Sequence, residues 1–352
     1  MPTPCTAEHC AVILLNHRNA PDTVACLRAL AAMSPQPGMI IVVDNNSSDD
    51  SVERIMREWS AFTSPLLVRQ EKGCIPVAPA GVRHILLSRS VNDGFSAGNN
   101  AGIRLALQDK GCKAVWLLNN DTEPMPDALG KLCERLNQRP DAGMAGSTLV
   151  YAHDKHTVQC AGGAACSPWT GTTRFFSMGE RLFVVRTADP SSIEAKLSYV
   201  AGASLLIRRD VLQSAGVLPE EYFLYYEDTD FGLLCARKGF FLAWAPNSIV
   251  YHKEGGSTGA ESATKWRTFN RPAWVDYLAL RNRVYMMRKH YPWALPLVLL
   301  SYLGVMLNRV RRGQADRIPL ICRAAWDGLR GRMGKPDHLF PALRDSHENP
   351  SY

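Results

Sequence analysis

Met39-Ile40-Ile41-Val42-Val43-Asp44-Asn45-Asn46-Ser47-Ser48-Asp49 joins an apolar run to a polar turn. A short, continuous apolar run is typical of a strand that is buried on both faces, as in a parallel sheet. The Asn, Ser and Asp residues that follow are the types that cap a helix, and apolar residues then recur with helical spacing as far as Trp59. The segment therefore predicts a strand at 39–44 and a helix at 47–59.

Strand and helix patterns alternate on both sides of this segment. Before it, an apolar run at 10–15 precedes helical spacing at 22–32. After it, strands are predicted at 84–87, in a run that ends at Asp121, and at 143–151, 197–207, 240–244 and 249–252. Helices are predicted at 101–107, 127–136, 209–214, 227–237 and 272–291. This order predicts an α/β fold with a Rossmann-like, mostly parallel sheet flanked by helices.

The composition is that of a globular protein. The chain has 352 residues, of which 46% are hydrophobic and 21% charged, so neither disorder nor a fibrous class is indicated. This length suffices for one large α/β domain with an appendage, or for two medium domains. None of the ten cysteines forms a C-x-x-C pair, so we expect reduced, cytosolic thiols rather than disulfides or a zinc site. The N-terminus does not show the pattern of a secretory signal.

The net charge of +7 is concentrated near the C-terminus. From Arg267 to Lys335 the chain has 14 basic residues against three acidic ones. A block of this kind indicates a surface for anionic lipid or another polyanion.

An uncharged stretch of 15 residues, 293–307, lies inside this basic block. It is shorter than the roughly 20 apolar residues of a membrane-spanning helix, contains Pro296, and is followed by Arg309, Arg311 and Arg312. We predict that it lies in or dips into a membrane surface, held by its basic flank. The alternative is a core helix packed on the rest of the protein. Gly255-Gly256-Ser257-Thr258-Gly259, before the helical region, is expected to be a mobile loop.

Asp44 ends its strand in the crevice where open α/β sheets bind ligands. Its carboxylate can accept the imide N–H of a pyrimidine base or a ribose hydroxyl, whereas the alternative is that it only caps the next helix. A dinucleotide site of the NAD type is excluded, because Asn16-His17-Arg18-Asn19-Ala20 stands where G-x-G-x-x-G would be needed.

Asn119-Asn120-Asp121 follows another buried strand. Asp121 can bind a divalent ion that also holds a diphosphate, since Mg²⁺ commonly takes one or two protein carboxylates. A turn built from Asn and Asp is the alternative. His252 also ends a predicted strand and is the candidate second ligand, although a lone His is more often structural.

Tyr226-Glu227-Asp228-Thr229-Asp230 opens a predicted helix. The helix dipole lowers the pKa of a carboxyl group here, whereas burial among Tyr222, Phe223, Tyr225 and Tyr226 would raise it. One carboxylate could then act as a general base, and the alternative is that Asp228 or Asp230 caps the helix.

Five segments together resemble the family 2 glycosyltransferases, which are inverting enzymes with the GT-A fold, and especially the bacterial rhamnosyltransferase and galactofuranosyltransferase branch. The resemblance covers about residues 10–290. The matching segments are 41–49, 92–100, 117–122, 202–209, and 223–239 with His252.

The resemblance implies a role for each candidate residue. Asp228 would be the catalytic base, and Asp121 and His252 would bind Mg²⁺ or Mn²⁺. Asn119 stands where the family has the first Asp of its D-x-D motif, so it would hydrogen-bond ribose or sugar. Gly202 and Glu227 would contact substrate. The nucleotide side of the pocket would be lined by Asn16, Asp44, Asn92, Gly98, Asn100, Asn119 and Asn120.

The resemblance also implies a domain organisation. Residues 1–258 would form a GT-A catalytic domain, with a nucleotide-sugar half at 10–125 and an acceptor half at 126–258. Part of the acceptor surface is expected in the loosely patterned segment 153–198. Residues 259–352 would form a helical, basic extension associated with the membrane.

The implied function is transfer of a sugar, with rhamnose favoured, from a dTDP- or UDP-sugar to a polyprenyl-linked or cell-surface polysaccharide acceptor, with inversion. We expect a cytoplasmic protein that is peripheral on the inner face of the plasma membrane and does not bind nucleic acid. One alternative is a nucleotidyltransferase that makes nucleotide sugars, although its glycine-rich signature is absent. The other is a non-catalytic family member that acts as a binding or scaffold protein.

Overall fold

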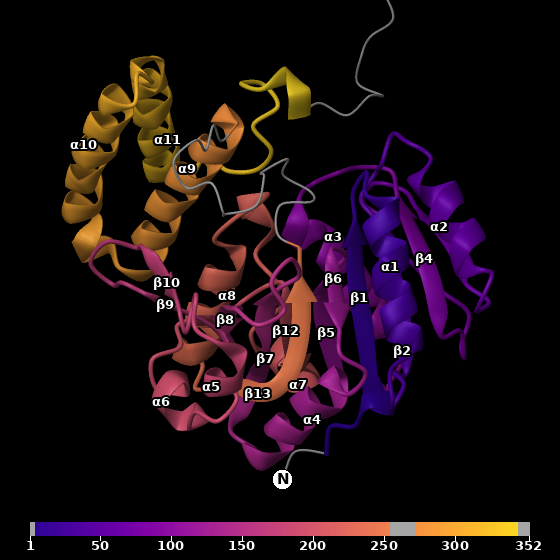
Figure 1. Ribbon diagram of the computed structural model, residues 1–352. Coiled ribbons are helices and arrows are strands. Elements are labelled where there is room, and N and C mark those ends of the chain that lie inside the picture. Colours follow the sequence, from indigo (N-terminus) through magenta and orange to yellow (C-terminus); the bar gives the residue numbers. More distant parts are fainter. Residues whose placement is uncertain (1–3, 254–271, 344–352) are drawn as a thin grey trace, which may run out of the picture.

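The computed structural model describes residues 4–253 and 272–343 (Figure 1). Its main sheet has ten strands, in the order β3-β4-β2-β1-β5-β12-β7-β13-β6 with β8 beside β7. These strands are β1 Cys10–Asn16, β2 Met39–Asp44, β3 Leu66–Gln70, β4 His84–Arg89, β5 Ala114–Asn119, β6 Thr122–Pro124, β7 Ala142–Tyr151, β8 Val158–Ala161, β12 Ser204–Arg208 and β13 Phe241–His252.

Helices cover both faces of the sheet. They are α1 Ala20–Ala31, α2 Ser51–Trp59, α3 Phe95–Ala106, α4 Ala128–Gln138, α5 Leu182–Val185, α6 Pro190–Glu194, α7 Arg209–Ser214 and α8 Glu227–Arg237. Because successive side chains of a strand point to opposite faces, β1 contributes side chains to two hydrophobic cores, one on each face of the sheet. Val12 and Leu14 pack with α1, α2 and α4, whereas Ala11 and Ile13 pack with α3, α7 and α8. The predicted three-layer α/β fold is confirmed.

The parallel strands bring the predicted site residues to one edge. In β1, Asn16 pairs with Asp44 of β2, and Leu15 pairs with Asn119 of β5. All three strands end at this edge, so the loops after them converge there. The geometry of the sheet thus supports the prediction that these polar residues face a common crevice.

Several predicted elements differ in extent or direction. The segment 197–207 divides into β11 Tyr199–Val200 and β12, and β12 runs antiparallel to both of its neighbours. The two short strands predicted at 240–244 and 249–252 are one strand, β13, with a change of register between Ala245 and Ile249. The edge strand β3 was not predicted, since its side chains are mostly half-buried and give a weak pattern. Helix α3 begins at Phe95, six residues before the helix predicted at 101–107.

A small second sheet and three long helices complete the described chain. The sheet has the order β10-β9-β11, with β9 Gly163–Cys166 and β10 Thr173–Phe175. The helices are α9 Ala273–His290, α10 Leu295–Arg311 and α11 Ile318–Arg330. Short 3₁₀ helices occur at Ala7–His9, Glu220–Tyr222, Pro292–Ala294, Ala315–Arg317 and Pro341–Leu343. Figure 1 shows the three long helices, orange to yellow, beside α8 and the small sheet.

Helix α9 joins this C-terminal group to the main body. Its Val284, Met286 and Met287 share a core with Tyr222 and with α10. The loop predicted at 255–259 and the boundary predicted at 258/259 lie outside the described residues.

Helix α10 is mostly exposed, which argues against the core alternative. Val298 and Tyr302 are buried against α9, but only 17% of its most apolar window lies inside the protein. Large apolar side chains are exposed along it at Leu297, Leu300, Leu303, Leu307 and Val310. The continuous helical stretch Pro292–Arg311 has 20 residues, so by length and composition alone it could cross a membrane, in contrast to the shorter uncharged run seen in the sequence.

Candidate active site

Asp121 and His252 meet where β6 pairs with the end of β13. Thr122 lies opposite His252 in the ladder, and His252 Nε2 is 3.3 Å from Asp121 Oδ1. Both residues are buried. Gln159 Oε1 lies 2.8 Å from His252 Nδ1, so Nδ1 is the ring nitrogen placed to donate to Gln159, and Nε2 is turned towards the Asp121 carboxylate.

This donor set fits a divalent cation. Two ligand atoms that lie about 2.1 Å from one octahedral ion are separated by about 3 Å, close to the observed spacing. An imidazole lone pair aimed at a carboxylate is unfavourable unless a proton or a metal ion lies between them. Gln159 supplies the outer hydrogen bond that fixes a metal-binding His. The structure thus brings together the two residues predicted to hold Mg²⁺ or Mn²⁺, and adds Gln159, which was not among the predicted site residues.

The Asp44 carboxylate organises the turn after β2. Its Oδ1 accepts hydrogen bonds from Asn16 Nδ2 at 2.8 Å and from Ser47 Oγ at 2.6 Å, and its Oδ2 accepts from Ser47 N at 3.0 Å. These contacts close a turn at Ser47, four residues before α2 begins at Ser51, so they are not contacts to the N-terminus of that helix. Asp44 is almost fully buried at the end of β2, and Oδ2 accepts only one of the three hydrogen bonds to its carboxylate.

A chain of buried side chains connects the loops after β1 and β5. Thr23 Oγ1 donates to Asn16 Oδ1 at 2.8 Å, and Asn120 Nδ2 donates to Thr23 Oγ1 at 2.9 Å. Asn16 and Asn120 are therefore engaged with the protein, where they fix the distance between two crevice loops. Asn119, which precedes Asn120, is half-buried at the end of β5. Its backbone N–H donates to Ala203 O at 3.0 Å.

Asn92 and Gly98, which were predicted to line the nucleotide side of the pocket, have different roles in the fold. Asn92 Oδ1 accepts from Asn45 Nδ2 at 2.9 Å and from Gly94 N at 3.1 Å, which closes the turn. At Gly98, an added Cβ would lie 2.4 Å from Leu15 Cδ1, so a larger residue there would require the Leu15 side chain to move.

Asn100 does not line the crevice as expected. It is fully buried; its Nδ2 donates to Leu218 O and Glu220 Oε1, each at 2.8 Å, and its Oδ1 accepts from Leu218 N at 3.1 Å. All of these partners lie in the segment that leads to Tyr222. Asn100 therefore supports the approach to the acidic helix α8.

Glu227 and Asp228 begin α8 in contrasting environments. Asp228 is half-buried; its Oδ1 accepts from Thr229 N at 2.7 Å and its Oδ2 from Gly202 N at 3.4 Å. Burial raises the pKa of Asp228, and these backbone hydrogen bonds oppose the rise. Glu227 is buried, and within the described chain its Oε2 has no hydrogen-bond partner. Burial, together with the Asp228 charge, raises the pKa of Glu227 to about 8. At neutral pH, Glu227 thus holds a proton next to a carboxylate that can accept one.

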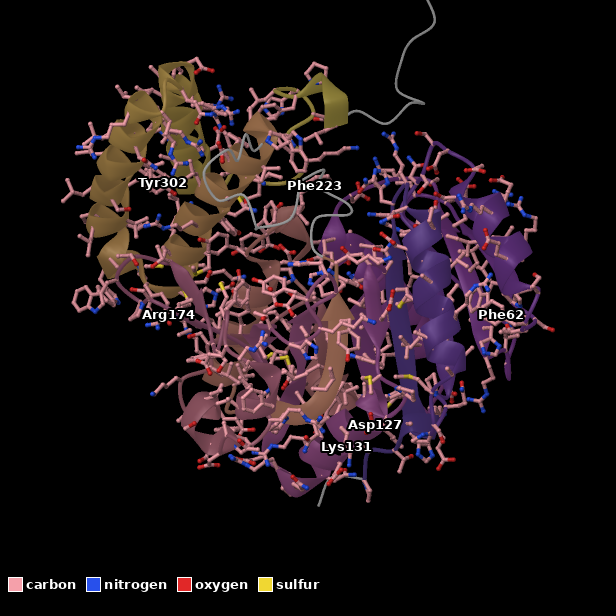
Figure 2. The ribbon with its side chains drawn as sticks, viewed as in Figure 1. Phe62, Asp127, Lys131, Arg174, Phe223 and Tyr302 are labelled. Atoms are coloured by element: carbon pink, nitrogen blue, oxygen red, sulfur yellow. The ribbon has the colours of Figure 1, made fainter. Side chains whose placement is uncertain are left out.

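The segment before these acids is strained. Phe223, Tyr225 and Tyr226 have φ values of 68°, 72° and 72°, which are costly for bulky residues. Figure 2 shows Phe223 between α3 and the C-terminal helices. Its carbonyl oxygen accepts from Phe95 N at 2.7 Å, and a Cβ at Gly94 would lie 2.2 Å from that oxygen. The close approach therefore requires glycine at 94.

Helix α9 supplies the bonds that hold this strained segment. The Asn282 amide is fully buried and donates to Leu224 O at 2.8 Å, Tyr225 O at 2.9 Å and Tyr222 O at 3.2 Å. Arg281 Nη2 also donates to Tyr222 O, at 3.1 Å. Buried backbone carbonyls need such partners, and these come from about 60 residues further along the chain.

Asp230 ties α8 to the same helix. Its carboxylate pairs with His290 Nε2 at 2.8 Å and Lys289 Nζ at 2.9 Å, and accepts from the Tyr222 hydroxyl. Although burial opposes ionisation, hydrogen bonds from His290, Tyr222 and Lys289 lower the pKa of Asp230. Asp230 is therefore a buried structural anion and not a proton acceptor.

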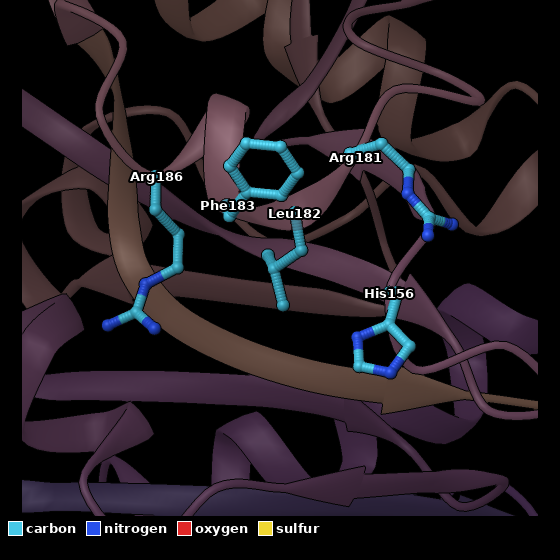
Figure 3. A pocket seen from close by; sticks show the side chains of 5 residues that line it. All are labelled: His156, Arg181, Leu182, Phe183 and Arg186. Carbon is cyan, nitrogen blue, oxygen red and sulfur yellow. The ribbon is translucent and has the colours of Figure 1, made fainter.

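A surface hollow of about 170 Å³ lies elsewhere, around α5 (Figure 3). It is lined by His156, Arg181, Leu182, Phe183 and Arg186. It contains none of the candidate site residues, although it falls in the loosely patterned segment 153–198.

Fold and site together define a GT-A glycosyltransferase: a mixed, mostly parallel sheet, with acidic residues after β5 and at the start of α8. The chain belongs to glycosyltransferase family 2, since the family model described as "Glycosyltransferase like family 2" matches residues 10–275.

Curated relatives are distant. An uncharacterized protein, y4gI of Sinorhizobium fredii, is 30% identical over 69% of this chain, which spans only 24% of that relative. The low-salt glycan biosynthesis hexosyltransferase Agl10 of Haloferax volcanii is 21% identical over 94% of each chain. The dTDP-rhamnosyl transferase RfbF of Shigella flexneri is 22% identical over 69% of this chain and 77% of its own length.

Solved structures share the fold. The mannosyltransferase PcManGT of Pyrobaculum calidifontis, in complex with GDP-Man and Mn²⁺, covers 94% of this chain and 89% of its own at 15% identity and a TM-score of 0.50. GalNAc-T7 with UDP, GalNAc and Mn²⁺ covers 79% of this chain and 47% of its own at 12% identity and a TM-score of 0.53.

Proposed function

We propose that this glycosyltransferase is inverting and metal-dependent, and that it moves a hexose from a dTDP- or UDP-sugar to a lipid-linked or cell-surface polysaccharide acceptor. The observation that carries the proposal is the pairing of Asp121 with His252 beside the end of β13, together with a half-buried Asp228 at the start of α8. The two parts are connected through backbone: Asn119 bonds to Ala203, and the neighbouring Gly202 bonds to Asp228.

The reaction is a single displacement at the anomeric carbon. The acceptor oxygen forms a bond to that carbon, its proton passes to Asp228, and the bond to the diphosphate breaks, so configuration inverts. Asp228 suits the proton transfer because burial raises the pKa of its carboxyl group while Gly202 and Thr229 fix its direction. Protonated Glu227 adds no second charge to the site.

Asp121 and His252 would hold Mg²⁺ or Mn²⁺, which, when bound, offsets the charge of the departing diphosphate. Asn119 lies two residues before Asp121 and is half-buried, so its amide would donate to ribose or to the sugar. Asp44 Oδ2 would meet the imide N–H of the pyrimidine, while Asn16 and Ser47 keep the carboxylate oriented. Gly202 would leave room for the acceptor next to Asp228.

Rhamnose remains the favoured donor sugar. The support is similarity to proteins named as dTDP-rhamnosyl transferase RfbF and O-antigen chain rhamnosyltransferase WbaN, at 22% and 19% identity. The same names, with that of Agl10, favour a role in polysaccharide or glycan biosynthesis.

We also propose that α10 rests on the inner face of the plasma membrane, in a cytoplasmic, peripheral arrangement. Its exposed leucines and the Arg309–Arg312 flank match a segment that inserts shallowly into anionic lipid. A polyprenyl-linked acceptor would be presented at that surface.

The test is turnover by the purified chain with a panel of nucleotide sugars and Mn²⁺, using polyprenyl-linked acceptors. We expect release of the nucleoside diphosphate, and loss of turnover in Asp228→Asn with donor binding retained. Near wild-type turnover in Asp228→Asn would exclude Asp228 as the base. Donor binding with neither transfer nor hydrolysis would indicate a binding protein, and release of pyrophosphate from a sugar phosphate and a nucleoside triphosphate would indicate a nucleotidyltransferase.

A further inference from the structure

Three buried thiols gather at the end of the sheet opposite the crevice. Their Sγ atoms form a nearly equilateral triangle: Cys5 to Cys133 is 3.4 Å, and Cys10 lies 3.6 Å from each of the others. All three side chains are almost fully buried. Within the chain that the structure describes, they form the one group of three or more ligand-type side chains spaced closely enough to hold a metal ion.

The cluster joins three parts of the fold. Cys5 precedes the first 3₁₀ helix, Cys10 is the first residue of β1, and Cys133 lies in α4. Asn137, one turn further along α4, holds the Cys5 backbone from both sides: its Oδ1 accepts from Cys5 N and its Nδ2 donates to Cys5 O, each at 2.8 Å. Cys5 is thus fastened in position by contacts that do not involve its thiol.

The geometry suits a thiophilic ion. Three thiolates at about 2.3 Å from a tetrahedral Zn²⁺ lie about 3.8 Å apart, a few tenths of an ångström beyond the observed spacings. A backbone oxygen, Thr6 O, lies 3.2 Å from Cys10 Sγ. The buried Arg208 guanidinium, which donates to Leu136 O and Ala142 O, places a positive charge near Cys5 and Cys133. That charge would offset the net negative charge of one Zn²⁺ bound to three thiolates.

We propose that Cys5, Cys10 and Cys133 bind one Zn²⁺, with Thr6 O or a water molecule in the fourth position, and that this ion fastens the N-terminal segment and β1 to α4. On binding, three Zn–S bonds form and three thiol protons are released, with no change of oxidation state. Cys10 is 5 positions from Cys5 and 123 positions from Cys133, so the three residues do not form a recognisable metal-binding motif in the sequence.

This site is separate from the active site. Cys10 and Asn16 stand at opposite ends of β1, about 20 Å apart at the usual rise of a strand. Its donors are sulfur, whereas Asp121 and His252 offer oxygen and nitrogen. The proposed Zn²⁺ is therefore structural, and catalysis would not depend directly on it.

The experiment is elemental analysis of the full chain, purified without an affinity tag and dialysed against metal-free buffer. We expect about one equivalent of Zn²⁺ per chain in the wild type and in Cys112→Ser, a control that also alters a buried thiol. We expect a loss of roughly one equivalent in Cys5→Ser and in Cys133→Ser. Substitution with Co²⁺ should produce a thiolate charge-transfer band in the wild type that both cluster variants lack.

A second measurement covers the case in which the variants fail to fold. Treatment of the wild type with a strong chelator should release Zn²⁺ together with three titratable thiols and lower the melting temperature, and added Zn²⁺ should restore it. The proposal is overturned if the wild type carries no Zn²⁺ or other thiophilic metal, if Cys5→Ser retains the full amount, or if mass spectrometry finds two of the three cysteines joined as a disulfide.

Discussion

The Asn282 amide of α9 donates to the carbonyl oxygen of Tyr225, two residues before Glu227, at 2.9 Å. Because the same amide also bonds to Tyr222 O and Leu224 O, one buried side chain fixes the left-handed segment that aims Asp228. The proposed base is thus positioned by a residue of α9, Asn282, that follows it by 54 positions along the chain.

Asn282→Ala should therefore impair turnover more than substrate binding. The Leu224 and Tyr225 carbonyls would lose the hydrogen bond from this amide, whereas Tyr222 O would keep the one from Arg281. Unpaired carbonyls cost about 1–3 kcal/mol in stability. Displacement of Asp228 should lower kcat by roughly 100-fold while the KM for the donor changes little. Asn308→Ala, at an exposed position of α10, is the control for loss of an asparagine from a helix. If kcat falls only in proportion to the unfolded fraction, Asn282 is merely structural.

Glu227 should make the fold less stable as the pH rises. Its folded-state pKa of about 8 exceeds its ordinary value of 4.5, so the folded protein retains a proton that the unfolded chain releases. This contribution is fully present below about pH 4.5 and is lost as the pH rises towards 8, amounting to a few kcal/mol.

Glu227→Gln should remove this dependence. The variant should gain stability relative to the wild type between pH 5 and about pH 8, as measured by urea denaturation across that range. A matched change at Glu134, which is exposed on α4, should leave the pH profile unchanged. Parallel profiles for wild type and Glu227→Gln would show that Glu227 is ionised in the folded protein.

Gln159 should tune the metal site without binding the metal. Gln159→Leu removes the hydrogen bond to His252 Nδ1, so affinity for Mn²⁺ should fall by about 10- to 100-fold. Titration of activity with Mn²⁺ measures this change, and saturating metal should recover most of the rate. Gln138→Leu, at an exposed position of α4, should have no effect. Unchanged metal dependence in Gln159→Leu, or in Asp121→Ala, would contradict the proposed site.

Helix α10 should bind anionic vesicles through its exposed leucines. Leu300 and Leu303 are each 60% exposed, and the double change Leu300→Ser/Leu303→Ser should reduce co-sedimentation by about tenfold. Ile75→Ser/Val77→Ser, which alters two apolar residues elsewhere that are 68% and 70% exposed, is the control. Equal binding by both double variants would place the lipid contact elsewhere in the protein.

The sequence predicted the elements whose signals are local. The apolar runs of β1, β2 and β5 and their polar ends follow from short-range chemistry, and parallel pairing then brings Asn16, Asp44 and Asn119 to one edge. The direction of β12 could not be predicted, because an antiparallel strand that is buried on both faces has the same apolar pattern as a parallel one.

Residues that act through distant partners were also missed or assigned differently. Asn100 sits in a polar turn motif, yet its partners lie 118 and 120 residues away, so nothing nearby shows that it faces inward. Asn282 and Gln159 did leave a weak signal, since each is a polar residue within an apolar pattern. Such positions are candidates for buried hydrogen bonds, but only the fold shows to what they are bonded.

The attachment of α8 to α9 through Asp230, Lys289 and His290 limits how this enzyme can be recombined. A chimera that exchanged the C-terminal helices of two such proteins at the boundary predicted from the sequence, near residue 258, would separate Asp228 from the α9 residues that hold its segment. A junction after His290 would retain Asn282 and the ion pairs with the parent that needs them. The proposed lipid contact through α10 could then be exchanged independently, whereas Asp228 and α9 would have to be inherited together.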